Sequence, residues 1–417
     1  MRVQRRNEKS FPLTIRLFSP WYTNAILVLL LLSSICHQNA ASLPSSNTSK
    51  RNLVSGGLIN LGNTCYLNAQ LECAYHIPKI RSIILNQSHD DPSIALLSLQ
   101  QLFTQMEKAS LQGNNDPRLT PAASTSLLCR NIGINPYEQQ DSQEFWKLFL
   151  PELDSQDLTN LFKGSYETYI AALDDSGREK IRKEIFLDLS LDVSNFDNAH
   201  SSMEDMFTSG ELLLCKEGNG WRPEKGAEKV DAIKGNKWIV KGDKNDDLVM
   251  PKILQLHLMR FNYDWQSGIM GKINSRFSFP KTLDLKGICD SENEVSKEDF
   301  LYDLQSVVVH VGEYGSGHYY AYVRPDIQSK KWFRYDDDRV TEVTFQDVKD
   351  DAFGGRAIKR MSKEEKRSIK GNSGRNGFLQ RFFSRNNRNQ FGFGGRASCA
   401  YMLQYVKRTE VPFLYEH

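Results

Sequence analysis

Cys65 stands where a glycine-rich turn meets an apolar run, in GLINLGNTCYLNAQLECAYHIP from residue 57 to 78. The apolar side chains recur with helical spacing and Asn63 or Thr64 is suited to cap the helix, so we expect Cys65 in its first turn. Backbone N–H groups and the dipole at a helix N-terminus favour the thiolate, the nucleophilic form of cysteine. The sequence therefore predicts a nucleophile at Cys65, whereas Cys73, on the packed side of the same helix, is expected to be a small buried hydrophobe.

A thiol nucleophile needs a base that accepts its proton and a third group that orients the base. HVGEYGSGHYYAYV places His318 after a flexible Gly-Ser-Gly, and WFRYDDD places Asp336 one strand later. An imidazole and a carboxylate at these positions can face each other across one hairpin. A lone histidine would more often be a hydrogen-bonded core residue, but here a candidate nucleophile and a candidate acid accompany it. The three residues together predict Cys-His-Asp nucleophilic catalysis.

The elements that would position these residues fall into two halves of the chain. Amphipathic patterns predict helices in SIALLSLQQLFTQM and in DSQEFWKLFLPEL, the second ended by Pro151 and the segment after it. Beyond residue 250, short apolar or alternating runs predict strands in KILQLHLMRF, SVVVHVG, YYAYVR, WFRYDD and AYMLQYVK. Helices first and strands later indicate an α+β fold in two lobes, with the site in a cleft between them.

Composition and cysteine usage argue against several kinds of site. The 417 residues are 40% hydrophobic and 25% charged, as in an average globular protein, and a net charge of +2 gives no reason to expect a nucleic-acid partner. The cysteines contain no CxxC pair, which argues against a disulfide framework and a tetrathiolate zinc site. They are Cys36, Cys65, Cys73, Cys129, Cys215, Cys289 and Cys399. We expect no metal and no cofactor.

Residues 1–52 differ in composition from the rest of the chain and are expected to be a targeting region. Basic residues precede the apolar run from Ala25 to Ile35 and small residues follow it, which is typical of a secretory signal peptide, here removed near Ala40 or Ala41. As an uncleaved anchor, the run would contact a membrane instead. An incorrectly placed start codon is a third interpretation. The serine-rich stretch that follows resembles a transit peptide, so we expect delivery to a compartment around a complex plastid, with the cytosol or nucleus as the alternative.

A second unusual segment, residues 356–396, interrupts the strand-rich half. It is rich in Lys, Arg, Gly, Asn and Ser and contains only two acids, Glu364 and Glu365, so its composition predicts a disordered basic insertion. The repeat FGGRA brackets it, beginning at Phe353 and again at Phe393, and an unspliced intron is therefore an alternative. A solvated loop is favoured over nucleic-acid binding.

The chain resembles the ubiquitin-specific proteases, a family of papain-like cysteine peptidases, from about Gly57 to Lys407 without the insertion. GLINLGNTCYLNAQLE is similar to the family's cysteine box and GSGHYYAYVRPDIQSKKWFRYDDDRV to its histidine box. YEQQDSQEFWKLFLPELD and LQLHLMRFNYDWQSGIMGKINSRFSFP are similar to intermediate family segments, in the same order. The resemblance implies a papain-like fold with a helical thumb, a β-rich palm and extended fingers, and is strongest to the herpesvirus-associated member.

The resemblance also implies a role for each candidate residue. Cys65 would be the nucleophile, His318 the general base and Asp336 its orienting acid. Asp337 could substitute for Asp336, because the adjacent acidic position can also reach the imidazole in this family. Asn60, five residues before the nucleophile, would donate a hydrogen bond to the oxyanion.

The implied substrate is a protein joined to the C-terminal glycine of ubiquitin, so ubiquitin and ubiquitinated proteins are the expected partners. Ubiquitin ends in Leu-Arg-Leu-Arg-Gly-Gly, and Asp141 and Glu144, three residues apart on one helix face, would hold its arginines. Many family members carry two CxxC pairs where this chain has SYETYI and ELLLCKEGNGW. Cys215 stands alone there, so no structural zinc is expected.

This organisation assigns residues 53–408 to one catalytic domain and residues 409–417 to a C-terminal tail. Two other interpretations stay open. The chain could be a catalytically impaired ubiquitin-binding protein, if the insertion distorts the site, or a membrane-tethered interaction protein whose role lies in its N-terminal segment.

Overall fold

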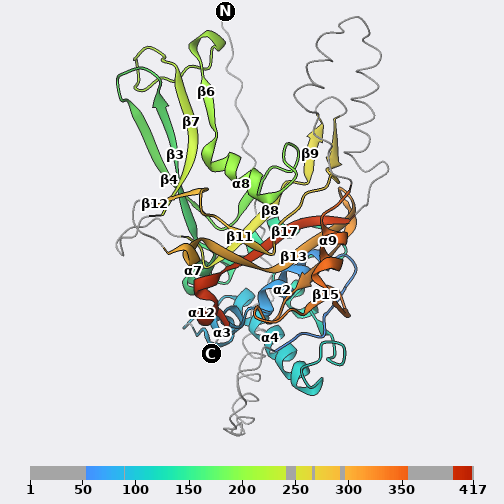
Figure 1. The fold of residues 1–417 in the computed structure, drawn as a ribbon. Coiled ribbons are helices and arrows are strands. Elements are labelled where there is room, and N and C mark those ends of the chain that lie inside the picture. Colours follow the sequence, from blue (N-terminus) through green and yellow to red (C-terminus); the bar gives the residue numbers. More distant parts are fainter. Residues whose placement is uncertain are drawn as a thin grey trace, which may run out of the picture. The chain divides into compact units, whose positions relative to one another are not determined.

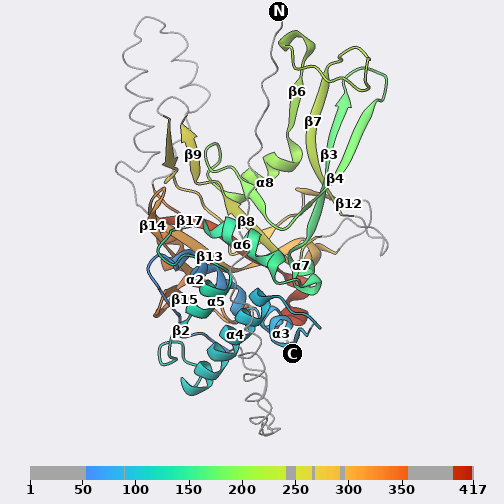
Figure 2. The same cartoon turned by 180° about the vertical axis from the view of Figure 1, so that it is seen from behind.

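The computed structural model describes residues 53–88, 90–240, 250–264, 268–291, 296–355 and 398–415 (Figures 1 and 2). The expected targeting region at residues 1–52 and the expected insertion at 356–396 lie outside the described residues. Within the described ranges, no helix has both the length and the apolar character needed to cross a membrane.

Helices occupy most of residues 65–162, as the sequence predicts. They are α2 (Cys65–Tyr75), α3 (Pro78–Asn86), α4 (Ile94–Gln112), α5 (Ser126–Asn131), α6 (Ser142–Glu152) and α7 (Gln156–Phe162), with the paired strands β1 (Leu58–Ile59) and β2 (Ala123–Ser124) beside them. Every residue of α2 is buried. The expectation of one buried apolar stripe therefore describes this helix only in part. The helix is enclosed on all sides, so its polar positions are buried as well. Pro151 lies in the last turn of α6, one residue before the helix ends.

The strand-rich half forms an eight-stranded sheet of order β16-β15-β14-β13-β17-β8-β5, with β11 paired to β13. Its members are β5 (Leu189–Leu191), β8 (Ile253–Leu258), β11 (Thr282–Asp284), β13 (Leu301–Glu313), β14 (Ser316–Val323), β15 (Trp332–Asp336), β16 (Arg339–Val343) and β17 (Ser398–Lys407). All five runs predicted as strands are in this sheet. The neighbours pair antiparallel, except that β5 runs parallel to β8.

The two faces of this sheet enter separate cores, because side chains alternate across a strand. Val308 and Tyr319 pack with the helices α2 and α4 on one face. Val309 and Tyr320 pack with residues of α9 (Phe345–Ala352) on the other. Helix α2 contacts β13, β14 and β15 and so lies beside the strands that carry the candidate base and acid (Figure 1).

A second sheet extends away from the helices (Figures 1 and 2). It has the order β12-β7-β3-β4, with β6 paired to β7, and consists of β3 (Gly164–Ala172), β4 (Glu179–Phe186), β6 (Gly210–Leu213), β7 (Ala232–Val240) and β12 (Cys289–Ser291). Helix α8 (Ala199–Thr208) packs on one of its faces, where the Phe207 ring meets Tyr166 and Trp238. Hydrophobic periodicity did not predict these strands, because most residues of β4 are exposed and charged.

The remaining described elements are short connections. They are the hairpin of β9 (Phe261–Asp264) and β10 (Ile269–Lys272), the 3-10 turns η1 (Cys215–Glu217), η2 (Lys297–Phe300) and η3 (Arg408–Glu410), and α12 (Val411–Tyr415). Cys215 is exposed in η1.

Candidate active site

Cys65 is the first residue of α2 and is almost fully buried, with 2% of its surface exposed. The turn before it is held by the Asn63 N–H, which donates to the Pro136 carbonyl (2.7 Å). Thr64 occupies the N-cap position, but its hydroxyl accepts a hydrogen bond from the Leu61 N–H (3.0 Å) instead of capping a helix N–H. The prediction that Cys65 lies in the first turn is confirmed, and the predicted side-chain cap is wrong.

His318 lies on β14, which contacts α2. Its Nε2 is 2.6 Å from Asp336 Oδ1, so Nδ1 is the ring nitrogen left for the thiol. The hydrogen bond to Asp336 and, next, a hydrogen bond with Cys65 raise the pKa of His318 to about 10. The structure thus brings thiol, imidazole and carboxylate together, an arrangement that can hold a thiolate beside an imidazolium.

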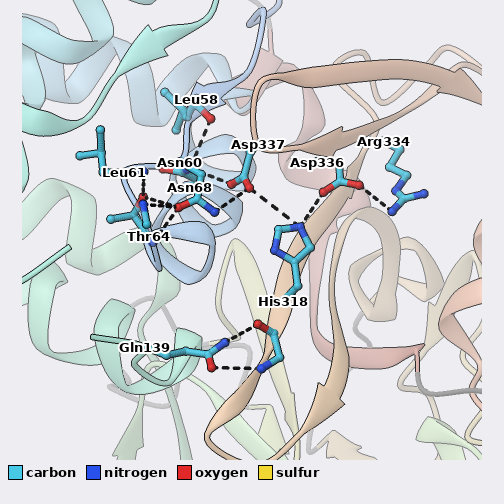
Figure 3. A network of polar contacts seen from close by, with 12 residues as sticks. Leu58, Asn60, Leu61, Thr64, Asn68, Gln139, His318, Arg334, Asp336 and Asp337 are labelled. Carbon is cyan, nitrogen blue, oxygen red and sulfur yellow. Dashed lines mark hydrogen bonds and ion pairs between the residues drawn. The ribbon is translucent and has the colours of Figure 1, made fainter. Parts of the chain in front are cut away.

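Asp336 ends β15, the neighbour of β14 in the sheet. Its Oδ1 faces His318, and its Oδ2 accepts a hydrogen bond from the Arg334 guanidinium (2.7 Å; Figure 3). The His318 bond, together with the Arg334 charge, lowers the pKa of Asp336. The carboxylate is therefore charged at neutral pH and can orient the imidazole.

Asp337 lies next in sequence, but its carboxylate has different partners. Its Oδ2 accepts from Asn60 Nδ2 (2.9 Å) and its Oδ1 from Asn68 Nδ2 (2.8 Å). The distance from His318 Nε2 to Asp337 Oδ2 is 3.9 Å. Burial raises the pKa of Asp337. Of the two neighbouring acids, Asp336 is the one hydrogen-bonded to the imidazole, and Asp337 is bonded to the two asparagines (Figure 3).

The backbone at Asp337 also fits closely against the segment that carries Asn60. Leu58 N–H donates to the Asp337 carbonyl (3.0 Å). A side chain at Gly57 would bring its Cβ to 2.3 Å from that same oxygen, and Gly57 has a φ of +94°. The Gly57 position therefore requires glycine, both for space and for backbone conformation.

The amide of Asn60 is oriented by hydrogen bonds at both ends. Its Oδ1 accepts from the backbone N–H groups of Gly62 (2.9 Å) and Thr64 (3.2 Å), so the Nδ2 end must face Asp337. An amide nitrogen has two hydrogens, and only one is donated to Asp337. Among the described residues, the second is donated to no other group.

Asn68 and Gln139 also contact the site residues, although the sequence patterns did not indicate them. Asn68 lies three residues after Cys65, about one turn along α2, and this spacing was an available signal. Gln139 Nε2 donates to the Gly317 carbonyl (2.8 Å), and its Oε1 accepts from the Gly317 N–H (3.1 Å; Figure 3). Gln139 and Gly317 are 178 residues apart in the sequence, so no local pattern could have predicted this contact. It fixes the backbone directly before His318.

Asp141 and Glu144 lie at the start of α6, in different surroundings. Asp141 is the N-cap residue, and its Oδ1 accepts from the N–H groups of Gln143 (2.8 Å) and Glu144 (3.1 Å). Its other oxygen accepts a hydrogen bond from the Tyr401 hydroxyl. Glu144 is exposed. The Asp141 carboxylate thus already serves the fold, and Glu144 offers the more accessible charge.

Among the described residues, His318, Asp336 and Asp337 form one group of three potential metal ligands, whose ligand atoms all lie within 4.8 Å of one another. The oxygens of Asp336 accept from His318 and Arg334, and those of Asp337 accept from two asparagines. With these hydrogen bonds in place, the donor set fits an imidazole-orienting role better than a cation site.

Comparisons with known proteins agree with this geometry. The family profile described as "Ubiquitin carboxyl-terminal hydrolase" matches residues 56–405. The chain is 31% identical over 330 residues to "Ubiquitin carboxyl-terminal hydrolase 7" of Caenorhabditis elegans, covering 74% of this chain and 27% of that protein. It is 32% identical over 328 residues to "Ubiquitin C-terminal hydrolase 13" of Arabidopsis thaliana, with coverages of 74% and 27%. It is also 32% identical over 317 residues to "Ubiquitin carboxyl-terminal hydrolase 15" of Schizosaccharomyces pombe, with coverages of 72% and 25%. The chain spans about a quarter of the length of these curated relatives.

Proposed function

Because the chain belongs to the ubiquitin carboxyl-terminal hydrolase family, we propose that it is a thiol-dependent deubiquitinase. It hydrolyses the peptide or isopeptide bond after the C-terminal glycine of ubiquitin. The observation that carries this proposal is the convergence of three side chains: Cys65 begins α2, α2 contacts the strand that carries His318, and His318 Nε2 is 2.6 Å from Asp336 Oδ1. A buried cysteine at a helix start would otherwise be a packing residue.

In the first half of the reaction, His318 holds the thiol proton and the Cys65 sulfur attacks the glycine carbonyl carbon. The C–N bond then breaks, and His318 donates the proton to the departing amine, which leaves as a lysine side chain or a peptide N-terminus. In the second half, His318 takes a proton from water, the hydroxide attacks the thioester, and the Cys65 sulfur leaves. Asp336 stays ionised and keeps Nδ1 of the imidazole directed at the sulfur.

Asn60 is the proposed oxyanion donor, together with the Cys65 backbone N–H. Negative charge develops on the carbonyl oxygen during attack, and donors fixed beforehand stabilise it. The support is the orientation of the Asn60 amide, which Gly62, Thr64 and Asp337 hold from both ends. We assign Asp337 to holding Asn60 rather than to replacing Asp336 as the acid, because its nearer oxygen is 3.9 Å from the imidazole.

Asp141 and Glu144 are proposed to attract the arginines in the tail of ubiquitin. Arginine pairs well with carboxylates because its planar fork can donate two parallel hydrogen bonds. The exposed Glu144 supports this role more directly than Asp141, whose oxygens already accept from α6 and from Tyr401.

We also propose the finer architecture that the family resemblance implies. Helices α2–α7 correspond to the thumb, the eight-stranded sheet to the palm and the second sheet to the fingers, all within a catalytic domain at residues 53–408. A domain of the herpesvirus-associated type is part of this proposal and rests on the resemblance of the sequence motifs. The relatives called "Ubiquitin carboxyl-terminal hydrolase 7" in Caenorhabditis elegans and Caenorhabditis briggsae, at 31% and 30% identity, support the family.

The test is labelling by a ubiquitin probe that carries an electrophile in place of its C-terminal carboxylate. We expect the wild-type chain to form a covalent adduct with the probe and Cys65→Ala to form none. Cys73→Ala is the matched control, because it removes another buried thiol of the same helix, and it should label like the wild type. Unlabelled wild-type protein that still binds ubiquitin would support the ubiquitin-binding alternative, and labelling at another cysteine would overturn the proposed nucleophile.

A further inference from the structure

We propose that Arg334 is a positioning residue for this reaction, which fixes one oxygen of Asp336 so that the other stays directed at His318. The inference rests on the proposed function. It gives a role to a residue that the cysteine and histidine boxes did not single out.

The sheet places the required side chains on one face. Arg334 and Asp336 are two residues apart on β15, so they point the same way. Arg334 pairs with Tyr322 of β14 in the antiparallel register, and Tyr320 and His318 follow Tyr322 at two-residue steps. In an antiparallel pair, directly opposed residues share a face. Base, acid and guanidinium therefore lie along one surface of the β14–β15 hairpin.

The contacts within this surface form a series from Arg334 through Asp336 to His318. Arg334 donates to Asp336 Oδ2 (2.7 Å), and Asp336 Oδ1 is 2.6 Å from His318 Nε2. Figure 3 shows Arg334 and His318 on opposite sides of the Asp336 carboxylate. Rotation of the carboxylate about its Cβ–Cγ bond would break both contacts together. A guanidinium that cannot move therefore also fixes the oxygen that the imidazole needs.

The guanidinium is itself held by an aromatic platform. Its central carbon lies 4.1 Å from the centroid of the Tyr320 ring, within the range of a cation–π contact. The Tyr320 hydroxyl donates to Asp351 of α9, which also accepts from Tyr322 (2.9 Å). Asp351 accepts from Ser398 of β17 as well (2.8 Å). The platform is thus fixed by three elements besides β15.

Stability alone does not account for this pair. The side chains of Arg334 and Asp336 are 37% and 29% exposed, and ion pairs this exposed contribute little to folding. We therefore expect the loss of Arg334 to change His318 much more than the melting temperature.

The charge and the positioning of Arg334 act on His318 in opposite directions. Removing a nearby positive charge would by itself raise the pKa of the imidazole. Releasing Asp336 from its fixed orientation would lower that pKa, because the imidazolium would lose its strongest partner. Among the described residues, the other charged or titratable groups near Arg334, Asp336 and His318 stay in place in both cases. They are Cys65 of α2, His310 of β13, Tyr320 of β14, Asp337 of the β15–β16 turn, Arg339 of β16 and, behind Tyr320, Asp351 of α9.

The experiment compares the full-length wild type with Arg334→Gln, Arg334→Lys and Lys331→Gln. The lysine variant keeps the charge and loses the planar fork. Lys331→Gln is the matched control, because it removes a cation from the same hairpin, where Lys331 pairs with Glu342 (3.6 Å). Alkylation of Cys65 by iodoacetamide is followed across pH by mass spectrometry of the Cys65 peptide, and kcat/KM is measured with a C-terminally fluorogenic ubiquitin. The alkylation rate reveals where His318 loses its proton, because a thiolate reacts differently beside an imidazolium and beside a neutral imidazole.

In Arg334→Gln we expect the transition of His318 to move down by about one pH unit, and kcat/KM near neutral pH to fall about fivefold. Arg334→Lys should fall between this variant and the wild type, and Lys331→Gln should match the wild type. An upward or absent shift in Arg334→Gln would overturn the positioning role. Failure of the proposed function is distinguishable, because the wild type would then show no turnover of ubiquitin while its alkylation profile still reports on His318.

Discussion

Two histidine–carboxylate pairs lie at opposite ends of helix α2, and only one of them is suited to catalysis. At the start of the helix, His318 and Asp336 meet Cys65. At its end, Glu72 and His76 meet Tyr335, the neighbour of Asp336 on β15. The same helix and the same strand therefore contribute to both pairs.

The two pairs differ in burial and in charge. The side chains of His318 and Asp336 are 34% and 29% exposed, and their atoms are 2.6 Å apart. Those of His76 and Glu72 are 0% and 2% exposed, with 3.5 Å between Nδ1 and Oε2. Hydrogen bonds raise the pKa of His318 to about 10. Burial lowers that of His76 to about 3 and raises that of Glu72 to about 8. At neutral pH the first pair is ionic and the second is neutral.

The neutral pair joins segments instead of moving protons. His76 Nδ1 lies 2.8 Å from the Glu72 carbonyl, so it carries the proton and donates, and Nε2 accepts from the Tyr335 hydroxyl (2.9 Å) and the Ser55 N–H (3.1 Å). Glu72 Oε1 accepts from the Ser55 hydroxyl (2.9 Å). These bonds connect α2, β15 and the segment that leads to Asn60. The comparison teaches that partners and burial, rather than residue type, decide whether a histidine carries charge.

Removal of each histidine in turn is the strongest test of the difference between the two pairs. His318→Ala should lower kcat/KM on the order of 10⁴-fold, because the thiol loses its base, and should leave the melting temperature nearly unchanged. His76→Ala should do the reverse, with a loss of roughly 2–4 kcal/mol in the free energy of unfolding. Kinetics with a fluorogenic ubiquitin and urea unfolding of both variants provide the measurement. If His76→Ala is inactive while still fully folded, the division between the two pairs is wrong.

The second prediction distinguishes Asp336 from its neighbour Asp337 as the acid that orients His318. Asp336→Asn should lower kcat by roughly 10³-fold, because an amide cannot stabilise the imidazolium. Asp337→Asn should lower it by roughly 10²-fold, because its new N–H group would face the amide of Asn60 or of Asn68 and disturb the oxyanion donor. Asp336→Asn should lower the pH at which His318 titrates much more than Asp337→Asn does, because Asp336 is the acid hydrogen-bonded to the imidazole. A larger loss in Asp337→Asn, together with a shifted histidine, would mean that Asp337 is the orienting acid.

The third prediction concerns the buried pair and the pH dependence of stability. The pKa of Glu72 rises from an ordinary 4.5 to about 8 on folding. The contribution of Glu72 to stability should therefore be fully present below about pH 4.5 and decline as the pH rises to about 8, by about 1.4 kcal/mol for each pH unit at most. His76, whose pKa is lowered to about 3, acts in the opposite direction below its ordinary pKa of 6.5, so the difference between the wild type and Glu72→Gln isolates Glu72. Glu72→Gln has no such titration, so its advantage over the wild type should grow across this window. A constant difference from pH 4 to 9, measured by urea unfolding, would contradict the protonated state of Glu72.

The sequence predicted that His318 and Asp336 would meet, whereas it did not predict the buried pair. Cys65, His318 and Asp336 could be found because a glycine-rich turn, a helix start and two strand ends mark them locally. His76 and Tyr335 are 259 residues apart in the sequence, so no local pattern predicts their hydrogen bond. Nor does the sequence show that burial makes His76 neutral.

The fold shows the same difference: strands with a local apolar pattern could be predicted, and strands without one could not. Strands β8, β13 and β17 are apolar because both of their faces are buried, and alternation and length were enough to predict them. Strand β4 is exposed at seven of its eight residues, so it lacks the apolar alternation of a half-buried strand. Its pairing with β3 could not be predicted from periodicity.

The smallest expected effect concerns a third kind of carboxylate, whose partner would come from the substrate. Glu144→Gln and Asp141→Asn each remove one charge at the start of α6, and asparagine preserves the N-cap of that helix. Each should weaken kcat/KM for ubiquitin substrates by about threefold to tenfold at low salt, because the arginines of the tail lose an acceptor. A short Gly-Gly reporter lacks those arginines and should be unaffected. Asp141→Ala serves as the control for the cap, because it also removes the bonds to the N–H groups of Gln143 and Glu144 and should lower stability by about 1 kcal/mol. If both substrates lose rate equally in Glu144→Gln, this carboxylate acts through the fold, and the arginines of ubiquitin must be bound elsewhere.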